Sequence, residues 1–203
     1  MAKKINNSNT VSPFLGGALV MLRPYAVADL PLVTQWVNDP MVTHYMFTGQ
    51  RPQTVEQVGV MMDADTRNEK NVIFIICDAA SGDPIGFAGL YDLHFTAQKA
   101  ELRIIIGSRA HWGKGCGTEV VELVTYYGFD RLQLHRVFLG VTSENAGAIR
   151  AYEKAGYVQE GILKDDIYRN SRYYDSVRMG MLRDMYYKNY YAAHAKRFTP
   201  NTK

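Results

Sequence analysis

The 203-residue sequence predicts a single α/β domain built on a mixed β-sheet with helices on both faces. Short apolar runs typical of strands alternate with amphipathic segments typical of helices, which favours helices packed against a sheet. Other strand-like runs follow one another without a helix between them, which predicts hairpins. No linker, repeat or low-complexity stretch divides the chain, and its 47% hydrophobic and 21% charged residues are typical of a globular domain.

In the first half of the chain the apolar pattern switches between strand and helix periods. Expected are, in order, a strand over 19–23, helices over 29–37 and 54–65, and strands over 72–78, 84–91 and 102–106. Thr54 can cap the second helix, because Gln57 follows three residues later as a capping box requires. The run 102–106 is apolar at consecutive positions, which is typical of a strand covered on both faces.

The second half continues the alternation. Expected are a helix over 113–129, a strand over 136–141, a helix over 145–155, strands over 157–163 and 173–181, and a helix over 182–195. The first of these helices has an apolar stripe, and Glu119, Glu122 and Thr125 are expected on its polar face. Gly156 is a natural C-terminal cap for the helix over 145–155. Residues 165–172 are expected to form an excursion between the last two strands.

Both chain ends are polar. Residues 1–18 are expected to be a flexible N-terminal lead and residues 196–203 a flexible tail, on either side of a domain over 19–195. Positions 6–10 are polar where a secretory signal would need its apolar segment. Two cysteines, Cys77 and Cys116, cannot make a disulfide framework, so the sequence indicates a reducing, cytoplasmic location.

Charge and hydropathy argue against several classes of partner. The 23 basic and 20 acidic residues give a net charge of +3 and are spread along the chain, so no nucleic-acid partner is expected. The longest apolar runs are far below the roughly 20 residues of a membrane helix, so no membrane partner is expected. Two cysteines are also too few for a zinc site, and no bound metal is expected.

A glycine-rich loop lies between a buried strand and an amphipathic helix. It consists of Trp112, Gly113, Lys114, Gly115, Cys116, Gly117 and Thr118. Glycine at every second position lets an anion approach backbone N–H groups at the positive end of the helix dipole, so a phosphate or pyrophosphate is expected there. The Gly-x-Gly-x-Gly spacing matches neither the dinucleotide fingerprint nor the nucleotide P-loop. The alternative is a glycine-rich turn of no chemical use, with Lys114 merely solvated.

A second motif runs from Asn145 to Tyr157. It contains Asn145, Ala148, Tyr152, Gly156 and Tyr157. Together the two segments resemble the GNAT superfamily of acetyl-CoA-dependent N-acetyltransferases, with Trp112 in place of the usual Gln or Arg. The resemblance spans about 19–182 and is closest to the branch that holds ribosomal-protein N-terminal, spermidine and amino-sugar acetyltransferases.

The resemblance implies a GNAT-like mixed, splayed sheet of six or seven strands that binds acetyl-CoA as co-substrate. The loop over 112–118 would hold the pyrophosphate. The strand at Ile104, Ile105 and Ile106 would pair with the pantetheine arm like an added strand. Asn145 would hydrogen-bond the cofactor, and the Tyr152 hydroxyl would protonate the leaving thiolate. The alternative for Tyr152 is an ordinary core position.

Acetyl transfer to an amine by direct attack in a ternary complex needs a neutral nucleophile and therefore a base. Our candidate is Glu101, which resembles the Glu at the start of the corresponding strand in the family. Its alternative is a plain ion pair with Arg103, and further candidates are Tyr91, Asp92 and His94. Cys116 is interpreted as a bystander, although a thiol at a helix start would have a lowered pKa and His111 is near enough in sequence to suggest covalent chemistry.

Three loops are expected to surround the acceptor: 45–50, 91–95 and 165–174. Their candidate substrate-binding residues are Tyr45, Phe47, Tyr91, Asp92, His94 and Arg172. We expect a small-molecule amine, with an amino sugar slightly ahead of a polyamine because Arg169 and Arg172 would offset Asp165 and Asp166 and bind phosphates. The alternatives are a protein N-terminus as acceptor or a non-catalytic acyl-CoA-binding module. The aromatic loops could also form a homodimer contact.

Overall fold

The computed structural model of the chain describes residues 13–198 and contains one eight-stranded sheet in the order β1-β2-β3-β4-β5-β6-β8-β7. The strands are β1 (Leu15–Gly16), β2 (Val20–Pro24), β3 (Val72–Asp78), β4 (Pro84–His94), β5 (Lys99–Ile106), β6 (Arg136–Thr142), β7 (Val158–Arg169) and β8 (Arg172–Leu182). The helices are α1 (Leu30–Asn38), α2 (Val55–Arg67), α3 (Cys116–Asp130), α4 (Ala146–Lys154), α5 (Arg183–Asn189) and α6 (Tyr191–Phe198).

The mixed α/β architecture is confirmed, with one strand more than the six or seven expected. The difference arises in the segment expected to be a flexible lead. There Leu15 and Gly16 pair with Leu22 and Met21 to form β1, and the Leu15 side chain is buried. Residues 1–12 and 199–203 of the expected lead and tail lie outside the described part of the chain.

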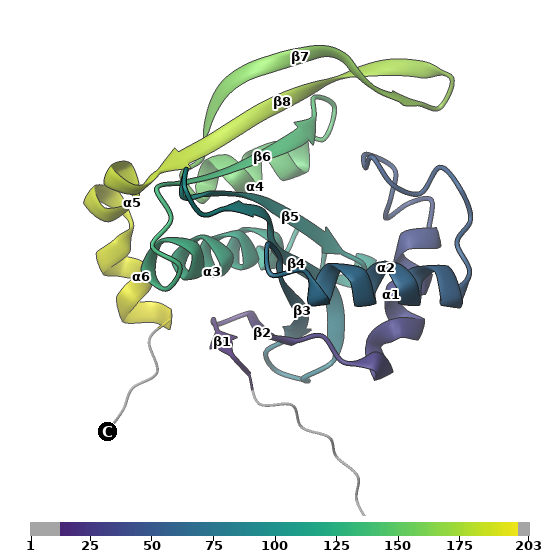
Figure 1. Cartoon of the computed structure of the whole chain (residues 1–203), viewed down its shortest axis with the longest axis horizontal. Coiled ribbons are helices and arrows are strands. Elements are labelled where there is room, and N and C mark those ends of the chain that lie inside the picture. The colour runs from purple at the N-terminus through teal and green to yellow at the C-terminus, as the bar shows by residue number, and fades with distance from the viewer. Residues whose placement is uncertain (1–12, 199–203) are drawn as a thin grey trace, which may run out of the picture.

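All neighbouring strands are antiparallel except β5 and β6, which are parallel. This pair joins the first five strands to the last three, and Figure 1 shows the two parts diverging from it. β7 and β8 make a long hairpin along the top of the view, and the loop between α1 and α2 reaches towards its tip. The sheet is therefore splayed, as the family resemblance implies.

Helices cover both faces of the sheet and bury two separate apolar clusters. The larger cluster packs α3, α4 and α6 on residues such as Leu90, Leu102, Val137 and Met179. The smaller cluster packs α1 and α2 on Ile75 and neighbouring residues of β3 and β4. Because side chains alternate along a strand, β5 sends Leu102 and Ile104 to the first cluster and Ile105 to the second.

Two of the expected helix signals are confirmed by hydrogen bonds. The Thr54 hydroxyl accepts from the Gln57 N–H at 3.2 Å, and the Gln57 side chain accepts from the Thr54 N–H at 2.9 Å. Gly156 follows α4 with a φ of 94°, a left-handed conformation that glycine adopts without strain. These local contacts explain why α2 and α4 begin and end close to their expected bounds.

The C-terminal third differs from expectation in two places. The excursion expected at 165–172 is instead the end of the β7–β8 hairpin, whose register shifts at a bulge between Leu163 and Ile167 and whose two-residue turn at Asn170 and Ser171 has φ values of 50° and 61°. The helix expected over 182–195 is two helices, α5 and α6, and α6 extends to Phe198, which is buried. The last ordered turn therefore includes residues assigned to the tail.

Glu119 and Thr125 of α3 are buried, contrary to the polar face expected for them. The Glu119 carboxylate accepts the backbone N–H groups of Ala18, Leu19 and Val20 at 2.6–2.9 Å and pairs with Arg197 of α6 at 2.7 Å. The first turn of α3 is thus tied to the N-terminal strand and to the last helix. Burial alone would raise the pKa of Glu119, but these amides and Arg197 outweigh it and hold the pKa below its usual value.

We expect the fold to lose stability in mild acid because of His194 of α6. Burial, together with the nearby Arg197, lowers its pKa from 6.5 to about 4, and its ring hydrogen-bonds the Tyr186 hydroxyl at 3.1 Å. The folded state favours the neutral ring. The free energy of unfolding therefore includes the full contribution of His194 above pH 6.5 and falls as the pH drops towards 4, by at most about 3 kcal/mol. Urea unfolding at pH 7 and pH 4.5 should show a smaller pH dependence for His194→Gln than for the wild type. Equal pH dependence in both proteins would contradict this assignment.

Candidate active site

The glycine loop has the backbone geometry of an anion site. Gly113 and Gly115 have φ values of 71° and 90°, and α3 begins directly after Gly115. A Cβ atom at Gly113 or Gly117 would meet nothing within 4 Å, so the amides at the helix start are open to a ligand. The exposed Trp112 donates its indole N–H to the Ile106 carbonyl at 2.8 Å and so ties the loop to the end of β5.

A gap between strands leads from this loop into the sheet. β5 pairs with β6 only at Lys99–Glu101 against Arg136–Phe138. Beyond that point, within the described sheet, residues 102–106 pair only with β4 and residues 139–142 pair only with β8. The free edge of β5 includes Ile104, Ile105 and Ile106, all partly buried. An extended ligand can therefore add to β5 as a strand would.

Tyr152 and Asn145 both lie on α4. The Tyr152 ring is buried and stacks edge-on against Tyr157, and no described residue hydrogen-bonds its hydroxyl. Burial raises the pKa of Tyr152, so the hydroxyl keeps its proton and can donate it. Asn145 accepts the Ala148 N–H at 3.1 Å and thereby caps α4. This cap uses the Oδ1 atom and leaves the amide N–H groups for another partner.

Glu101 lies at the closed end of the gap, opposite Tyr91 in the register of β4 and β5. Its carboxylate pairs with Arg103 at 2.6 Å, and Arg103 also pairs with Asp92 at 2.8 Å and lies over the Tyr91 ring. The ion pair that the sequence left open as an alternative is therefore present. Burial raises the pKa of Tyr91, so its phenol also stays protonated.

Two of the three expected acceptor loops meet at the open side of the gap. Arg169 donates to the carbonyls of Met46 and Thr48, both at 2.8 Å, and Gln50 donates to the Tyr168 carbonyl at 3.0 Å. These bonds fasten the loop between α1 and α2 to the β7–β8 hairpin. The Tyr45 carbonyl accepts from Thr142 at the end of β6, the exposed Phe47 lies in the same loop, and Arg172 pairs with Glu144.

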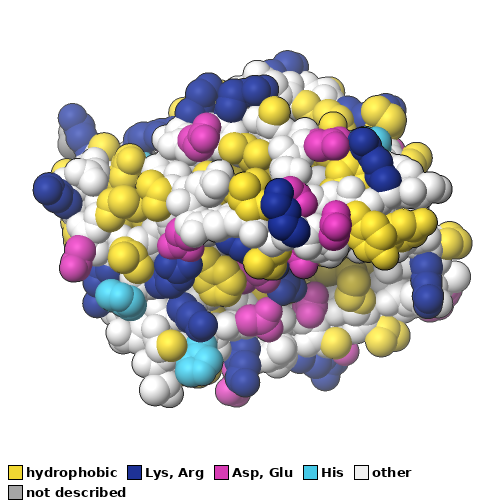
Figure 2. All heavy atoms as spheres, turned by 90° about the horizontal axis from the view of Figure 1, so that it is seen from above, with side chains coloured by type: hydrophobic (Ala, Val, Ile, Leu, Met, Phe, Trp, Pro, Cys, Tyr) yellow, Lys and Arg dark blue, Asp and Glu magenta, His cyan; other side chains and the backbone are white. Residues whose placement is uncertain are grey.

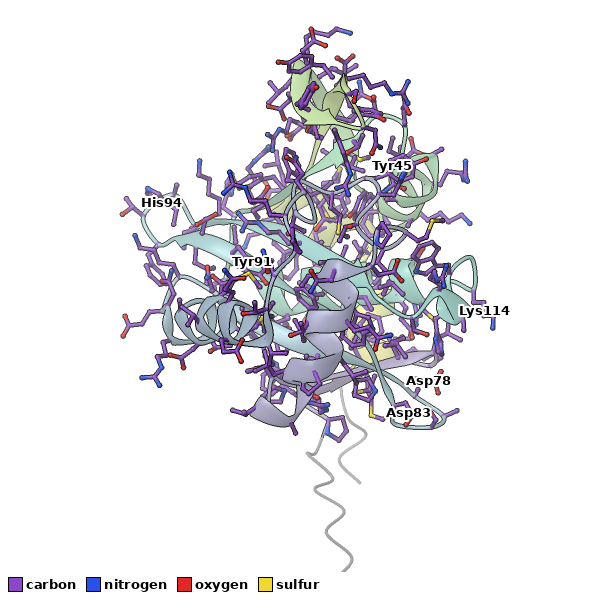
Figure 3. The ribbon with its side chains drawn as sticks, turned by 90° about the vertical axis from the view of Figure 1, so that its right-hand side faces the viewer. Tyr45, Asp78, Asp83, Tyr91, His94 and Lys114 are labelled. Carbon is purple, nitrogen blue, oxygen red and sulfur yellow. The ribbon has the colours of Figure 1, made fainter. Side chains whose placement is uncertain are left out.

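His94 is not brought to these residues. Figure 3 places Tyr91 and His94 towards one side of the molecule, Lys114 on the opposite side, and Tyr45 above them. The His94 ring accepts the Ala97 N–H at 3.0 Å and so serves the turn between β4 and β5. Its role as an acceptor contact stays a prediction.

The pKa of the Cys116 thiol is raised, not lowered as expected at a helix start. Its side chain is buried, and burial raises the pKa of the thiol, as does the nearby Asp78. His111 hydrogen-bonds Ser108 at 2.8 Å and pairs with Asp78 at 3.3 Å, so it is engaged elsewhere. Both findings support Cys116 as a bystander.

The sequence did not single out Arg178 or Ser176, which lie on the same face as Glu101. Arg178 of β8 lies between Glu101 and Asp166, and the buried Ser176 hydroxyl has no hydrogen-bond partner among residues 13–198. Their placement depends on the register of β6 with β8, which pairs Gly140 with Arg178 and Thr142 with Ser176. No local pattern encodes such a register.

Surface charges are mixed. In Figure 2 basic, acidic and hydrophobic side chains alternate over the face seen from above, without a field of one sign. Within residues 13–198 no helix is long and apolar enough to cross a membrane.

Gly115→Val should abolish ligand binding at the glycine loop. A β-branched side chain cannot adopt a φ of 90° without strain, and its Cβ would meet Leu19 at 3.3 Å. Calorimetry with CoA should detect binding to the wild type and none to the variant, with circular dichroism confirming that the variant is folded. Unchanged CoA affinity would show that the loop is only a turn.

Known proteins resemble this chain over most of its length. Residues 20–158 match the family model described as the acetyltransferase (GNAT) domain. Spermidine N(1)-acetyltransferase of Escherichia coli (strain K12) is 32% identical over 168 residues, which is 82% of this chain and 88% of that protein. The Vibrio cholerae enzyme of the same name is 29% identical over 81% of this chain and 94% of its own.

Solved structures give the same result. A crystal structure of spermidine N-acetyltransferase from Vibrio cholerae in complex with CoA and spermine has a TM-score of 0.77 and 28% identity, covering 83% of this chain and 98% of that one. The family model matches the part of the chain that carries the glycine loop, the gap between β5 and β6, and Tyr152. The chain therefore belongs to the GNAT acetyltransferase family and is an acyl-CoA-dependent N-acetyltransferase that uses acetyl-CoA as co-substrate.

Proposed function

We propose that this enzyme acetylates a polyamine such as spermidine. The observation that carries the proposal is the row of charged side chains at the closed end of the gap, where Asp92, Glu101 and Asp166 from three strands meet two arginines. Carboxylates outnumber guanidinium groups in this row, which favours a cationic acceptor. The named activity of the curated relatives supports the same acceptor class.

A fourth carboxylate adds to this negative field. Burial raises the pKa of Asp65 on α2, Arg103 partly opposes the rise, and Asp92 adds to it. Asp65 is thus within electrostatic reach of the same row. A second or third ammonium of a polyamine would have a partner there.

The slight preference for an amino sugar rested on arginines that the structure uses otherwise. Arg169 is engaged with backbone carbonyls of the α1–α2 loop, and Arg172 pairs with Glu144 and lies over the Tyr174 ring. Asp166 instead pairs with Arg178. Neither expected arginine therefore offsets the acidic residues, and this favours a polyamine over a sugar phosphate.

In the proposed mechanism the acceptor amine attacks the thioester directly. The loop at 112–118, including Lys114 and Thr118, would hold the pyrophosphate of acetyl-CoA, and β5 and Asn145 would hold its pantetheine arm. Removing a proton from an amine of pKa about 10.4 at pH 7 costs roughly 4.6 kcal/mol. Glu101 takes this proton, directly or through a water. The new N–C bond forms as the C–S bond breaks, and Tyr152 donates its proton to the departing sulfur.

A screen of acceptors tests the proposal. CoA release should be measured with spermidine, spermine, an amino-sugar phosphate and a peptide with a free N-terminus. We expect the polyamines to have the highest kcat/KM, and added salt to lower that value because exposed charges steer the acceptor. Preferred turnover of the sugar or the peptide would reject the polyamine.

A further inference from the structure

Arg178 bridges the two parts of the splayed sheet. Its guanidinium lies 3.9 Å from Glu101 of β5 and 3.4 Å from Asp166 of β7, although Arg178 itself belongs to β8. The parallel pairing of β5 and β6 covers only three residue pairs, so this contact crosses the gap close to its end. With about a third of its side chain exposed, Arg178 is accessible to a ligand on this face.

Gly140 of β6 leaves space for the Arg178 guanidinium. A Cβ atom at Gly140 would lie 2.7 Å from the Arg178 Nη1 atom and 3.4 Å from the Ser176 hydroxyl oxygen. The absence of a side chain at Gly140 therefore lets the guanidinium approach the β6 backbone closely. The fully buried Ser176 hydroxyl, unpartnered among the described residues, lies beside this space. A polar group is thus left for a ligand or a water that enters when the arginine moves.

We propose that Arg178 controls the affinity for the acceptor by acting as a resident cation between Glu101 and Asp166. It occupies the place of an acceptor ammonium in the free enzyme, so an amine must displace it from at least Glu101 before attack. A monoamine exchanges one ion contact for another and gains little. A polyamine also reaches Asp92 or Asp65 with a further ammonium, and that second contact makes the exchange favourable. The inference rests on the proposed polyamine acetylation and adds the residue with which the acceptor competes.

Two variants test this role in different ways. Arg178→Gln removes the resident charge. Gly140→Ala keeps the charge but places a methyl group where the guanidinium lies, so the guanidinium must move. Because displacing Arg178 costs the same for every amine, we expect both to raise kcat/KM for spermidine and for n-butylamine by about tenfold, the size of one charge-assisted contact, and to leave the ratio of the two values unchanged. The gain should come mainly from a lower KM, and Arg178→Lys should stay close to the wild type.

Matched controls come from the same hairpin. Lys164→Gln removes a charge whose partner is Asp175, and Gly161→Ala adds a Cβ that meets nothing within 4 Å. Both should leave kcat/KM for either acceptor unchanged, and CoA affinity measured by calorimetry should be the same in the wild type and all five variants.

The outcomes separate the two proposals. If the wild type acetylates spermidine but kcat/KM stays the same in both test variants, or rises equally in the controls, the role of Arg178 is refuted and the polyamine activity stands. If both acceptors lose activity in Arg178→Gln, Arg178 is a structural clamp and its role as a competing cation is refuted. If the wild type turns over no polyamine, both proposals fail.

Discussion

Replacing Tyr152 with Phe should lower kcat by about 10²-fold, the low end of the effect of losing a general acid. The ring stays in its buried place against Tyr157, because only the hydroxyl is removed and no described residue hydrogen-bonds it. The thiolate would then leave without a proton donor. Steady-state kinetics with acetyl-CoA and spermidine, together with calorimetric CoA affinity, measures the effect.

The control for this prediction is Tyr157→Phe. That hydroxyl is 2.7 Å from the Thr125 hydroxyl, and burial raises the pKa of Tyr157 as it does that of Tyr152. The control variant loses a buried hydrogen bond and hence some stability, but kcat should change little. Wild-type turnover in Tyr152→Phe would return Tyr152 to an ordinary core position.

Glu119→Gln should have the largest effect on stability, a loss of about 3–5 kcal/mol. The substitution leaves three backbone N–H groups facing a side chain with a single acceptor oxygen, and it leaves the charge of Arg197 without its buried partner. The N-terminal strand and α6 should loosen together. Urea unfolding monitored by circular dichroism gives the free energy difference.

Glu122→Gln is the matched control, because Glu122 pairs with the same Arg197 at 2.7 Å but accepts no backbone N–H from residues 13–198 and lies nearer the surface. Its loss should be about 1 kcal/mol or less. Similar losses in the two variants would mean that the three backbone amides contribute little.

Local signals predicted the elements that depend on neighbouring residues. The Thr54–Gln57 capping box and the glycine after α4 are complete within a few residues, so α2 and α4 could be placed from the sequence. The β7–β8 turn could not, because Asn170 and Ser171 adopt positive φ without the glycine that usually signals such a turn. The break between α5 and α6 at Tyr190 likewise has neither proline nor glycine to announce it.

The proposed active site divides in the same way. Its proposed cofactor half is a contiguous loop followed by a short helix motif, and both could be predicted directly from the sequence. The proposed acceptor half is assembled by register across β4, β5, β6 and β8, which brings Glu101 to Arg178 over a separation of 77 residues in sequence. Glu119 was misplaced for a related reason, since its amide partners lie about 100 residues earlier.

Initial velocities with acetyl-CoA and spermidine varied together test the central claim most directly. If the gap between β5 and β6 holds both substrates for direct transfer, double-reciprocal plots should intersect, and CoA and N-acetylspermidine should form in equal amounts. Parallel plots, or a mass increase of one acetyl group on the protein at Cys116 before spermidine is added, would contradict direct transfer and favour a covalent acetyl-enzyme.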